Sequence, residues 1–449
     1  MGTSTSPNGG TAINTMIQHR RNALIATGLM AITACSSPSD EQADTESIDA
    51  SAAVTYTNGY WYTTRGPQTG FTLGERYIDG DRFVAEPIAG ARRVDLGGAF
   101  VVPPFGEAHN HSVDGPGTER TAQRYIEQGV FYYKNPNSIF AFTEPLLDYW
   151  RRTDTLDVSF SFGGLSRDEG HPEKLYRMLI DYGLYKDFDA DELDGQAFFD
   201  VATDAKLDAR WPAIIGNKPD FLKLYLLEHD TDTSDGLPET LFREIVARAK
   251  KAGLRTSVHV ETVQDLALAV DAGANEAAHL PAYNLNLAKD SASAVIPNAL
   301  IEIMAAQQFA VIATVNVSQG RDYAADDLQL VMDRQADNLR RLHEAGVPIA
   351  IGSDSYFQTA WDEIQSLKRL GIFNDATLTR LWIETPALSI FPERKIGRLA
   401  PDYEASFLVL ECNPLDDIAC TQSISLGVKQ GNTLIAPKLS PSGTTAAAD

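Results

Sequence analysis

Short apolar segments alternate with helical segments along the central part of this 449-residue chain. The apolar segments have the length of strands, and the stretches between them include amphipathic helices expected at 241–252, 262–271 and 327–345. Repeated strand, loop and helix is typical of parallel sheets whose faces are covered by helices. One strand is expected to end at His111, and seven more are expected at 130–133, 158–162, 221–226, 256–260, 276–279, 310–314 and 348–352.

Eight such units predict an α/β fold, a (β/α)8 or TIM barrel over residues 104–393, with an insertion at 176–211. An open doubly wound sheet is the alternative fold. No Gly-rich phosphate loop follows the first strand, so that alternative lacks its usual ligand signature.

Alternating segments with turn signals occur at both ends of the chain. We therefore expect both chain ends to form a small β-sandwich, from residues 54–103 and 394–438. A disordered tail is expected at residues 439–449.

The first 35 residues read as an export signal. Arg20 and Arg21 precede an apolar run at 23–32, which is too short to span a bilayer, and Cys35 follows. This order resembles a bacterial lipoprotein leader in which Cys35 is lipidated, while an ordinary cleaved signal and a twin-arginine route stay open. We expect an exported protein of the bacterial cell envelope, touching the membrane only through its lipid anchor. Residues 1–15 precede an alternative start at Met16, and 36–53 form an acidic linker.

The net charge of −23 argues against a nucleic-acid partner, because phosphate binding needs clustered Lys and Arg. Two further cysteines, Cys412 and Cys420, are close enough in sequence to form a disulfide in an oxidising compartment, and two free thiols are the alternative.

His109 and His111 close the first expected strand of the barrel. Side chains alternate in a strand, so both histidines point the same way and can hold one metal ion. The same parity places Lys223 and Tyr225 on the inner face of the fourth strand, away from the outward leucines between them. A lysine inside a closed barrel must be neutralised, paired or modified.

Later strands add His259, His279 and Asp354 with the same inward parity, each at a strand end. Active sites of parallel barrels form at the carboxyl ends of the strands. Taken singly, the two histidines are more often hydrogen-bonded core residues and Asp354 a helix cap, but the combination predicts one metal site at the barrel mouth.

This set of residues resembles the amidohydrolase superfamily, in its binuclear, carboxylated-lysine type and its imidazolonepropionase- and prolidase-like branch. The resemblance rests on His109-Asn110-His111, Lys223, His259, His279 and Asp354, and on the segment 395–401. Two segments depart from the usual pattern: residues 103–107 read Pro-Pro-Phe-Gly-Glu, and 352–354 read Gly-Ser-Asp.

The resemblance implies a metal-dependent hydrolase acting on carbon–nitrogen bonds of amides or dipeptide-like molecules. It implies two divalent ions, expected to be zinc, bridged by a CO2-derived carbamate on Lys223 and by a hydroxide. His109, His111 and Asp354 would hold the inner ion, His259 and His279 the outer one. Asp354 would also move protons, and this task makes it catalytic.

Residues that contact the substrate are nominated from their position near the mouth. Tyr225 is a candidate donor to a tetrahedral oxyanion, and packing above the site is its alternative role. His171 and His229 are candidates to contact the substrate, and exposed loop positions are the alternative; Tyr356 and Trp361 are aromatic candidates for a wall of the site. Hydrolysis of lactones or phosphotriesters at the same site is the alternative function, and a non-catalytic surface binding protein is the alternative class.

Overall fold

The computed structural model describes residues 53–436, apart from 66–67, 114–116 and 233. The leader, Cys35, most of the linker and the tail expected at 439–449 lie outside these residues. None of the helices in the described part has both the length and the apolar character needed to cross a membrane.

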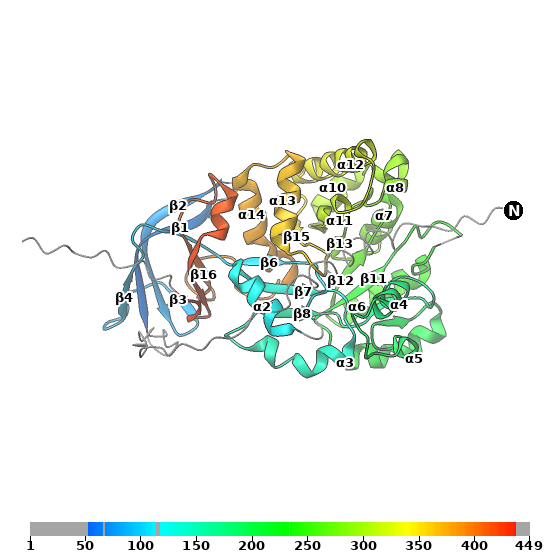
Figure 1. Ribbon diagram of the computed structural model, residues 1–449, viewed down its shortest axis with the longest axis horizontal. Coiled ribbons are helices and arrows are strands. Elements are labelled where there is room, and N and C mark those ends of the chain that lie inside the picture. Colours follow the sequence, from blue (N-terminus) through cyan, green and yellow to red (C-terminus); the bar gives the residue numbers. More distant parts are fainter. Residues whose placement is uncertain (1–52, 66–67, 114–116, 233, 437–449) are drawn as a thin grey trace, which may run out of the picture.

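An eight-stranded sheet contains strands from both ends of the chain, as the sequence predicts. Its order is β18-β17-β16-β5-β1-β2-β3, with β4 paired to β1. The two chain ends meet where β5 and β16 pair antiparallel, with Val102 opposite Leu408. In Figure 1 the blue strands and the orange-red β16 lie together at one end of the molecule. The strands are β1 (Val54–Arg65), β2 (Gln68–Asp79), β3 (Arg82–Val84), β4 (Arg92–Asp95), β5 (Phe100–Val102), β16 (Phe407–Leu410), β17 (Ile424–Lys429) and β18 (Asn432–Ile435).

The rest of the chain is an α/β unit with parallel strands. A three-stranded sheet has the order β6-β7-β8, and a seven-stranded sheet has the order β10-β9-β11-β12-β13-β14-β15. A strand lies at each of the eight predicted positions, although the first ends at Glu107 rather than at His111. The strands are β6 (Phe105–Glu107), β7 (Val130–Asn135), β8 (Asp157–Phe160), β9 (Gly164–Ser166), β10 (Phe198–Asp200), β11 (Phe221–Tyr225), β12 (Arg255–His259), β13 (Glu276–Ala278), β14 (Ala310–Ala313) and β15 (Ile349–Ile351).

The third expected strand, at 158–162, corresponds to β8, which ends at Phe160 and pairs with β7. A separate strand that was not expected, β9, follows it and pairs with β11. Phe162 between them has a left-handed φ of 59°, so the chain turns there before β9 begins. At the opposite margin, the Ala108 N–H donates to the Ile351 carbonyl, which joins the end of β6 to β15.

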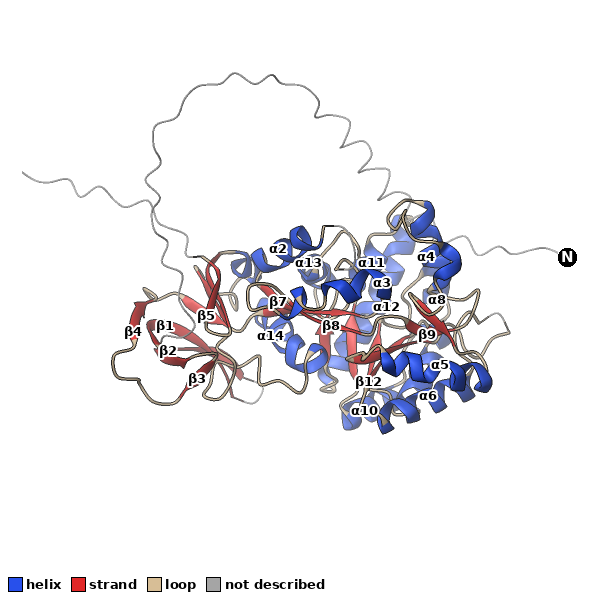
Figure 2. Ribbon diagram, turned by 90° about the horizontal axis from the view of Figure 1, so that it is seen from below, coloured by secondary structure: helices blue, strands red, loops and turns tan. Residues whose placement is uncertain are grey.

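Helices lie around the parallel strands (Figure 2). Several begin where the sequence supplies a capping side chain: Thr262 and Asp265 form a capping box on α7, and Thr359 and Asp362 form another on α13. The helices are α2 (Thr118–Glu127), α3 (Phe140–Thr143), α4 (Glu173–Asp181), α5 (Asp204–Gly216), α6 (Glu239–Lys251), α7 (Val263–Asp271), α8 (Leu285–Lys289), α9 (Ser291–Ala294), α10 (Asn298–Gln307), α11 (Val315–Gln319), α12 (Ala325–Glu344), α13 (Ala360–Leu370) and α14 (Asp375–Thr385), with the short π-helix η4 (Pro386–Ile390) and 3-10 helix η5 (Ile418–Gln422).

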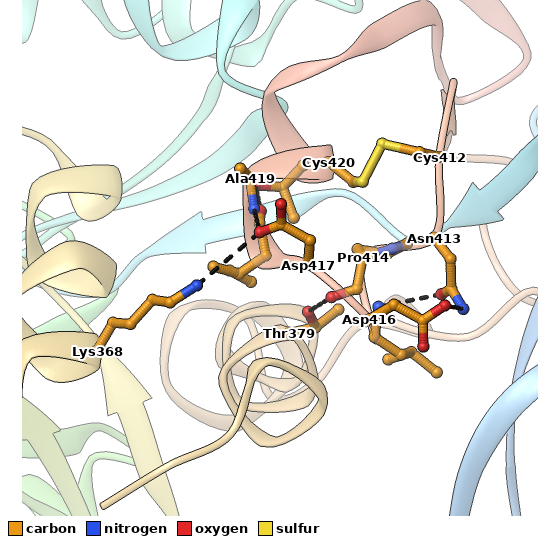
Figure 3. The surroundings of a disulfide bond; sticks show 12 residues. Lys368, Thr379, Cys412, Asn413, Pro414, Asp416, Asp417, Ala419 and Cys420 are labelled. Carbon is orange, nitrogen blue, oxygen red and sulfur yellow. Dashed lines mark hydrogen bonds and ion pairs between the residues drawn. A yellow bond between two sulfur atoms is a disulfide. The ribbon is translucent and has the colours of Figure 1, made fainter. Parts of the chain in front are cut away.

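Cys412 and Cys420 form a disulfide across the segment that leads into η5 (Figure 3). The enclosed loop is also fastened to the helices beneath it. Thr379 of α14 donates to the Pro414 carbonyl at 2.9 Å, and Lys368 of α13 lies 3.9 Å from Asp417. This loop therefore links the strands of the eight-stranded sheet to the α/β unit.

Candidate metal centre

The predicted ligands converge at the carboxyl ends of five parallel strands. His109 and His111 follow β6, His279 follows β13, and Asp354 follows β15, whereas Lys223 and His259 lie within β11 and β12. The register pairs Lys223 with Ser257 and Tyr225 with His259. This pairing leaves Lys223, Tyr225 and His259 on one face.

Asp354 is the centre of the cluster. Its Oδ1 lies 3.1 Å from His111 Nε2 and 3.4 Å from His109 Nε2, and its Oδ2 lies 3.7 Å from His279 Nε2. One ligand atom from each of His109, His279 and Asp354 falls within a group no wider than 4.8 Å. Imidazole nitrogens with a carboxylate are a donor set that divalent transition metals use in proteins.

His259 extends the cluster on the side of β12. Its ring centroid lies 4.6 Å from that of His279 and 5.1 Å from that of His171. His259 Nε2 is buried and has no hydrogen-bond partner, and the same is true of Lys223 Nζ. A buried polar atom without a hydrogen-bond partner costs free energy. Two such atoms facing one cluster are what we expect of residues that bind a metal ion or a bridging anion.

Burial disfavours the charged forms of the basic groups of this cluster. It lowers the pKa of His109 and His259 to about 3 each, with the charge of Lys223 adding to the effect. Burial also lowers the pKa of Lys223 to about 7, although the carboxylates of Asp354 and Glu276 oppose the shift. Neutral imidazole is the form that binds metals, and a neutral amine is the form that reacts with CO2.

Asp354 behaves in the opposite way. Burial alone would raise the pKa of its carboxyl, but His109 and His111 outweigh that effect and hold the pKa well below its ordinary range. The cluster thus combines an ionised carboxylate with neutral nitrogen donors, as a cation site requires.

A buried hydrogen-bond network holds the paired histidines from behind. Glu107 accepts from the Ser353 N–H at 2.8 Å and from its hydroxyl at 2.7 Å, while Asn110 Nδ2 donates to the Ser353 hydroxyl and to Tyr125. Glu107 and Ser353 lie in the two segments, 103–107 and 352–354, at which the sequence departs from the usual superfamily pattern. They contact each other directly, so the two departures belong to one local arrangement.

Two ligands also have backbones in the left-handed region, which non-glycine residues seldom adopt. His279 has φ 75° and Asp354 has φ 45°. Such conformations cost about 1–3 kcal/mol each and persist where the surrounding structure imposes them. Hydrogen bonds here impose them: the His279 N–H donates to Ile312, the Asp354 N–H donates to His109, and His279 Nδ1 lies 2.8 Å from the Thr314 hydroxyl.

The nominated substrate residues separate into two groups. Tyr225 and His171 lie beside the cluster, with ring centroids 5.1 Å apart, and the Tyr356 ring stacks on His111 at 5.7 Å. His229 is turned to Asp265, 2.8 Å away, so it supports a loop of the mouth. Trp361 stacks on Trp382 in the core and does not line the site.

Three residues near the mouth escaped the sequence analysis. Glu261 Oε1 lies 3.5 Å from His259 Nε2, the Tyr283 ring lies 5.1 Å from His279, and Arg321 lies over the Tyr283 ring. Glu261 could have been found, because it has the parity of His259 two residues later. Tyr283 and Arg321 come from loops, where alternation gives no guide.

Known proteins give independent support for this arrangement. Residues 220–435 match the sequence profile of the Amidohydrolase family. Over these residues the chain is similar to the amidohydrolase family. This similarity indicates a hydrolase of the kind that acts on carbon–nitrogen bonds. No curated protein matches it by sequence.

Several solved structures share the fold of this chain. The A. niger ochratoxinase has 17% identity and a TM-score of 0.68, covering 89% of this chain and 99% of its own. A prolidase complexed with N-methylphosphonate-L-proline has 15% identity and a TM-score of 0.64, covering 86% and 100%. Molinate hydrolase has 15% identity and a TM-score of 0.63, covering 85% and 94%. At these identities the likeness concerns the fold.

Proposed function

We propose that this amidohydrolase is a binuclear metallohydrolase that cleaves the carbon–nitrogen bond of small amides or dipeptide-like molecules. The observation that carries the proposal is Lys223: its buried, unpartnered Nζ shares a face with Tyr225 and His259. A mononuclear site would give this lysine no task. Carboxylation would replace an unsatisfied amine with an anion able to bridge two cations.

Two ions would be held by different residues in this proposal. His109, His111 and Asp354 would bind the inner ion, His259 and His279 the outer ion, and a carbamate on Lys223 would bind both. When bound, divalent ions such as zinc supply Lewis acidity and lower the pKa of coordinated water.

The residues of the chain supply the remaining chemistry. The ionised carboxylate of Asp354 would take a proton from the attacking water and deliver it to the leaving nitrogen. The Tyr225 hydroxyl, now donating to Asn137 Oδ1 at 2.9 Å, would turn to the developing oxyanion. His171, half-buried beside Tyr225 and His259, would exclude water from this side and position the amide.

The supporting fold in this proposal is a closed (β/α)8 barrel beside a small β-sandwich. Hydrogen bonds from Ala108 to Ile351 at one margin and from Asp220 to Phe160 at the other support closure of the two parallel sheets into one ring. Export to the cell envelope with lipidation at Cys35 is a further proposal, and the Cys412–Cys420 disulfide supports an oxidising compartment.

Metal analysis tests the binuclear site. We expect about two ions per chain in protein purified with divalent metal and bicarbonate. Lys223→Ala should lose at least one ion, and bicarbonate should not restore it. One metal ion per chain, with no change in Lys223→Ala, would contradict the proposal.

A hydrolysis screen tests the reaction. N-acyl amino acids, dipeptides, lactones and organophosphates form the panel, and Asp354→Asn is the matched inactive variant. Amide cleavage that depends on Asp354 supports the proposal. Cleavage of lactones or phosphotriesters alone would favour the alternative function, and activity that survives Asp354→Asn would remove this residue from its role.

A further inference from the structure

Glu261 places a carboxylate beside one of the proposed metal ligands. It lies two residues after His259, and the Val260 N–H between them still bonds to Ala278 of β13. The alternation of β12 therefore continues past its last residue, and the side chains of His259 and Glu261 turn to the same face. Glu261 Oε1 lies 3.5 Å from His259 Nε2. The resemblance to the superfamily does not include Glu261.

These two atoms face each other without a hydrogen bond. His259 Nε2 is buried and has no hydrogen-bond partner, and the side chain is only 7% exposed. Among the residues that the structure describes, Glu261 forms no other ion pair, and its carboxylate accepts no hydrogen bond. An unprotonated imidazole nitrogen and a carboxylate oxygen are both acceptors, so neither satisfies the other. A cation bound between them would satisfy both.

The separation of the two atoms suits shared coordination of one ion. Zinc binds imidazole nitrogens and carboxylate oxygens at about 2.0–2.2 Å, so two such ligands at a tetrahedral angle lie about 3.4 Å apart. The 3.5 Å between His259 Nε2 and Glu261 Oε1 is close to this value. It also falls within the 3.1–3.7 Å that separate the Asp354 carboxylate from its three histidines elsewhere in the cluster.

The backbone of Glu261 is held in place by α7. Its N–H donates to Asp265 Oδ2 at 3.2 Å, and the neighbouring Thr262 N–H donates to the same oxygen at 3.1 Å. Thr262 and Asp265 also form the capping box of this helix. Because the backbone is already fixed beside His259, only the side-chain torsions of Glu261 need to be ordered when a metal ion binds.

We propose, building on the binuclear site proposed above, that Glu261 is a ligand of the outer metal ion. Each ion would then have two histidines and one carboxylate. The inner set is His109, His111 and Asp354, and the outer set is His259, His279 and Glu261. Without Glu261 the outer ion depends on neutral imidazoles and on the bridging groups. A carboxylate of its own would bind a divalent ion more tightly, because opposite charges attract strongly in a buried site.

Metal titration tests this inference. Protein stripped of metal is titrated with Zn2+ in competition with a chromophoric chelator, with bicarbonate present, and the dissociation constants of the two ions are measured. We expect Glu261→Gln to weaken the binding of one ion by about 10- to 100-fold and to leave the other unchanged. Glu228→Gln is the matched control, because it removes a half-buried carboxylate from the neighbouring mouth loop. It should leave both constants nearly unchanged.

Double variants identify the ion that is affected. If Glu261 and His259 hold the same ion, His259→Ala/Glu261→Gln should bind metal no more weakly than His259→Ala alone. Combined with His109→Ala, which affects the inner ion, the loss caused by Glu261→Gln should add to the other loss. The number of ions per chain is counted for each variant, and thermal unfolding of the metal-free proteins checks that each one folds.

A crystal structure of the zinc-loaded protein gives an independent measurement. We expect a carboxylate oxygen of Glu261 about 2.0–2.2 Å from the outer ion. A carboxylate turned away from that ion would overturn the inference, as would unchanged constants for both ions in Glu261→Gln or additive losses with His259→Ala. Wild-type protein that binds only one ion would instead refute the binuclear site on which the inference rests.

Discussion

Two lysines point into the parallel-strand interior, and they have different surroundings. Lys223 has no partner, whereas Lys134 of β7 forms an ion pair with Glu276 and also donates to Ser389 of η4. Burial lowers the pKa of Lys134, but Glu276 opposes this shift at close range. The paired amine is held as an ammonium and is unsuited to react with CO2, so the proposed carbamate belongs on Lys223 alone.

Loss of one member of the Lys134–Glu276 pair should destabilise the protein strongly. Both side chains are buried, so Lys134→Met leaves the carboxylate of Glu276 without its counter-ion. We expect the free energy of unfolding to fall by about 3–5 kcal/mol, measured by urea denaturation. The double variant Lys134→Met/Glu276→Leu should recover much of this loss. A single-variant cost below about 1 kcal/mol would show that the pair is not held as ions.

Tyr225 and Tyr176 offer a matched comparison at the active site. Both hydroxyls bond to the Asn137 side chain at 2.9 Å, but only Tyr225 lies against His171 and His259. Tyr225→Phe should lower kcat by about 100-fold with little change in KM, because the hydroxyl acts on the oxyanion. Tyr176→Phe should leave kcat within a few-fold. Equal losses of kcat in the two variants would indicate that both hydroxyls act only by positioning Asn137.

Residue parity explains how much of the candidate site could be predicted. Alternation in 221–226 and 256–260 is enough to orient Lys223 and His259, and the structure agrees with both. Alternation does not predict the inward direction of Lys134, because β7 is buried on both faces and its apolar pattern is uniform. Partners that come from distant strands, such as Glu276, depend on sheet order, which the local sequence does not contain.

At the scale of elements, α7 holds two mouth loops through one side chain. Asp265, in its first turn, accepts from the N–H groups of Glu228 and His229 after β11 and of Glu261 and Thr262 after β12. Burial would raise the pKa of Asp265, but these bonds and that of the His229 ring outweigh it and lower the pKa. The helix therefore carries an ionised carboxylate that joins neighbouring loops.

The His229–Asp265 contact predicts a pH-dependent stability. The hydrogen bond to Asp265 raises the pKa of His229 above its ordinary value of 6.5 despite the opposing effect of burial. The charge-assisted part of this bond is therefore fully present below pH 6.5 and is lost as the pH rises through the elevated pKa. The difference in unfolding free energy between wild type and His229→Gln should be largest near pH 6 and shrink toward about pH 9.

Urea denaturation across this range measures the effect. Asp265→Asn, which removes the carboxylate, should abolish the pH dependence of the difference. A difference that grows with pH would mean that the ring binds as the neutral form.

The segment after β8 marks the limit of element prediction. All eight main strands were predictable from apolar runs bounded by loops, but β9 and β10 were not. Each has only three residues, and β9 follows β8 after a turn at Phe162, a bulky residue in a left-handed conformation. Its side chain gives no local signal for such a turn, so only the pairing with β11 reveals it.

At the scale of the whole molecule, a buried ionic cluster joins the two sheet systems. Lys429 of β17 donates to the Thr155 carbonyl and to Asp157 at the start of β8, both at 2.6 Å. Arg394 lies 2.7 Å from the other oxygen of Asp157 and binds Glu404 with two hydrogen bonds. Lys429 of the eight-stranded sheet is thus paired with Asp157 of the α/β unit, so each part of the molecule neutralises a buried charge of the other.

Lys429→Met should weaken this connection. The lysine side chain is fully buried, and its loss leaves one oxygen of Asp157 and two backbone carbonyls without a donor. We expect the unfolding free energy to fall by about 3–5 kcal/mol in chemical denaturation. Lys395→Met, at an exposed lysine that follows Arg394 in sequence, should change it by no more than about 0.5 kcal/mol. A similar small change in Lys429→Met would mean that packing alone joins the two parts.

The pairing of Val102 with Leu408 sets an order of assembly during biosynthesis. Strands β1 to β5 are synthesised first, yet the edge of β5 is completed by β16, which is synthesised after the whole α/β unit. Closing such a long loop is slow. Until β16 pairs with β5, the unpaired edge of β5 can pair with strands of other chains. Synthesis that stops before residue 407 would leave that edge permanently open, so the last strands of the chain protect its first ones from aggregation.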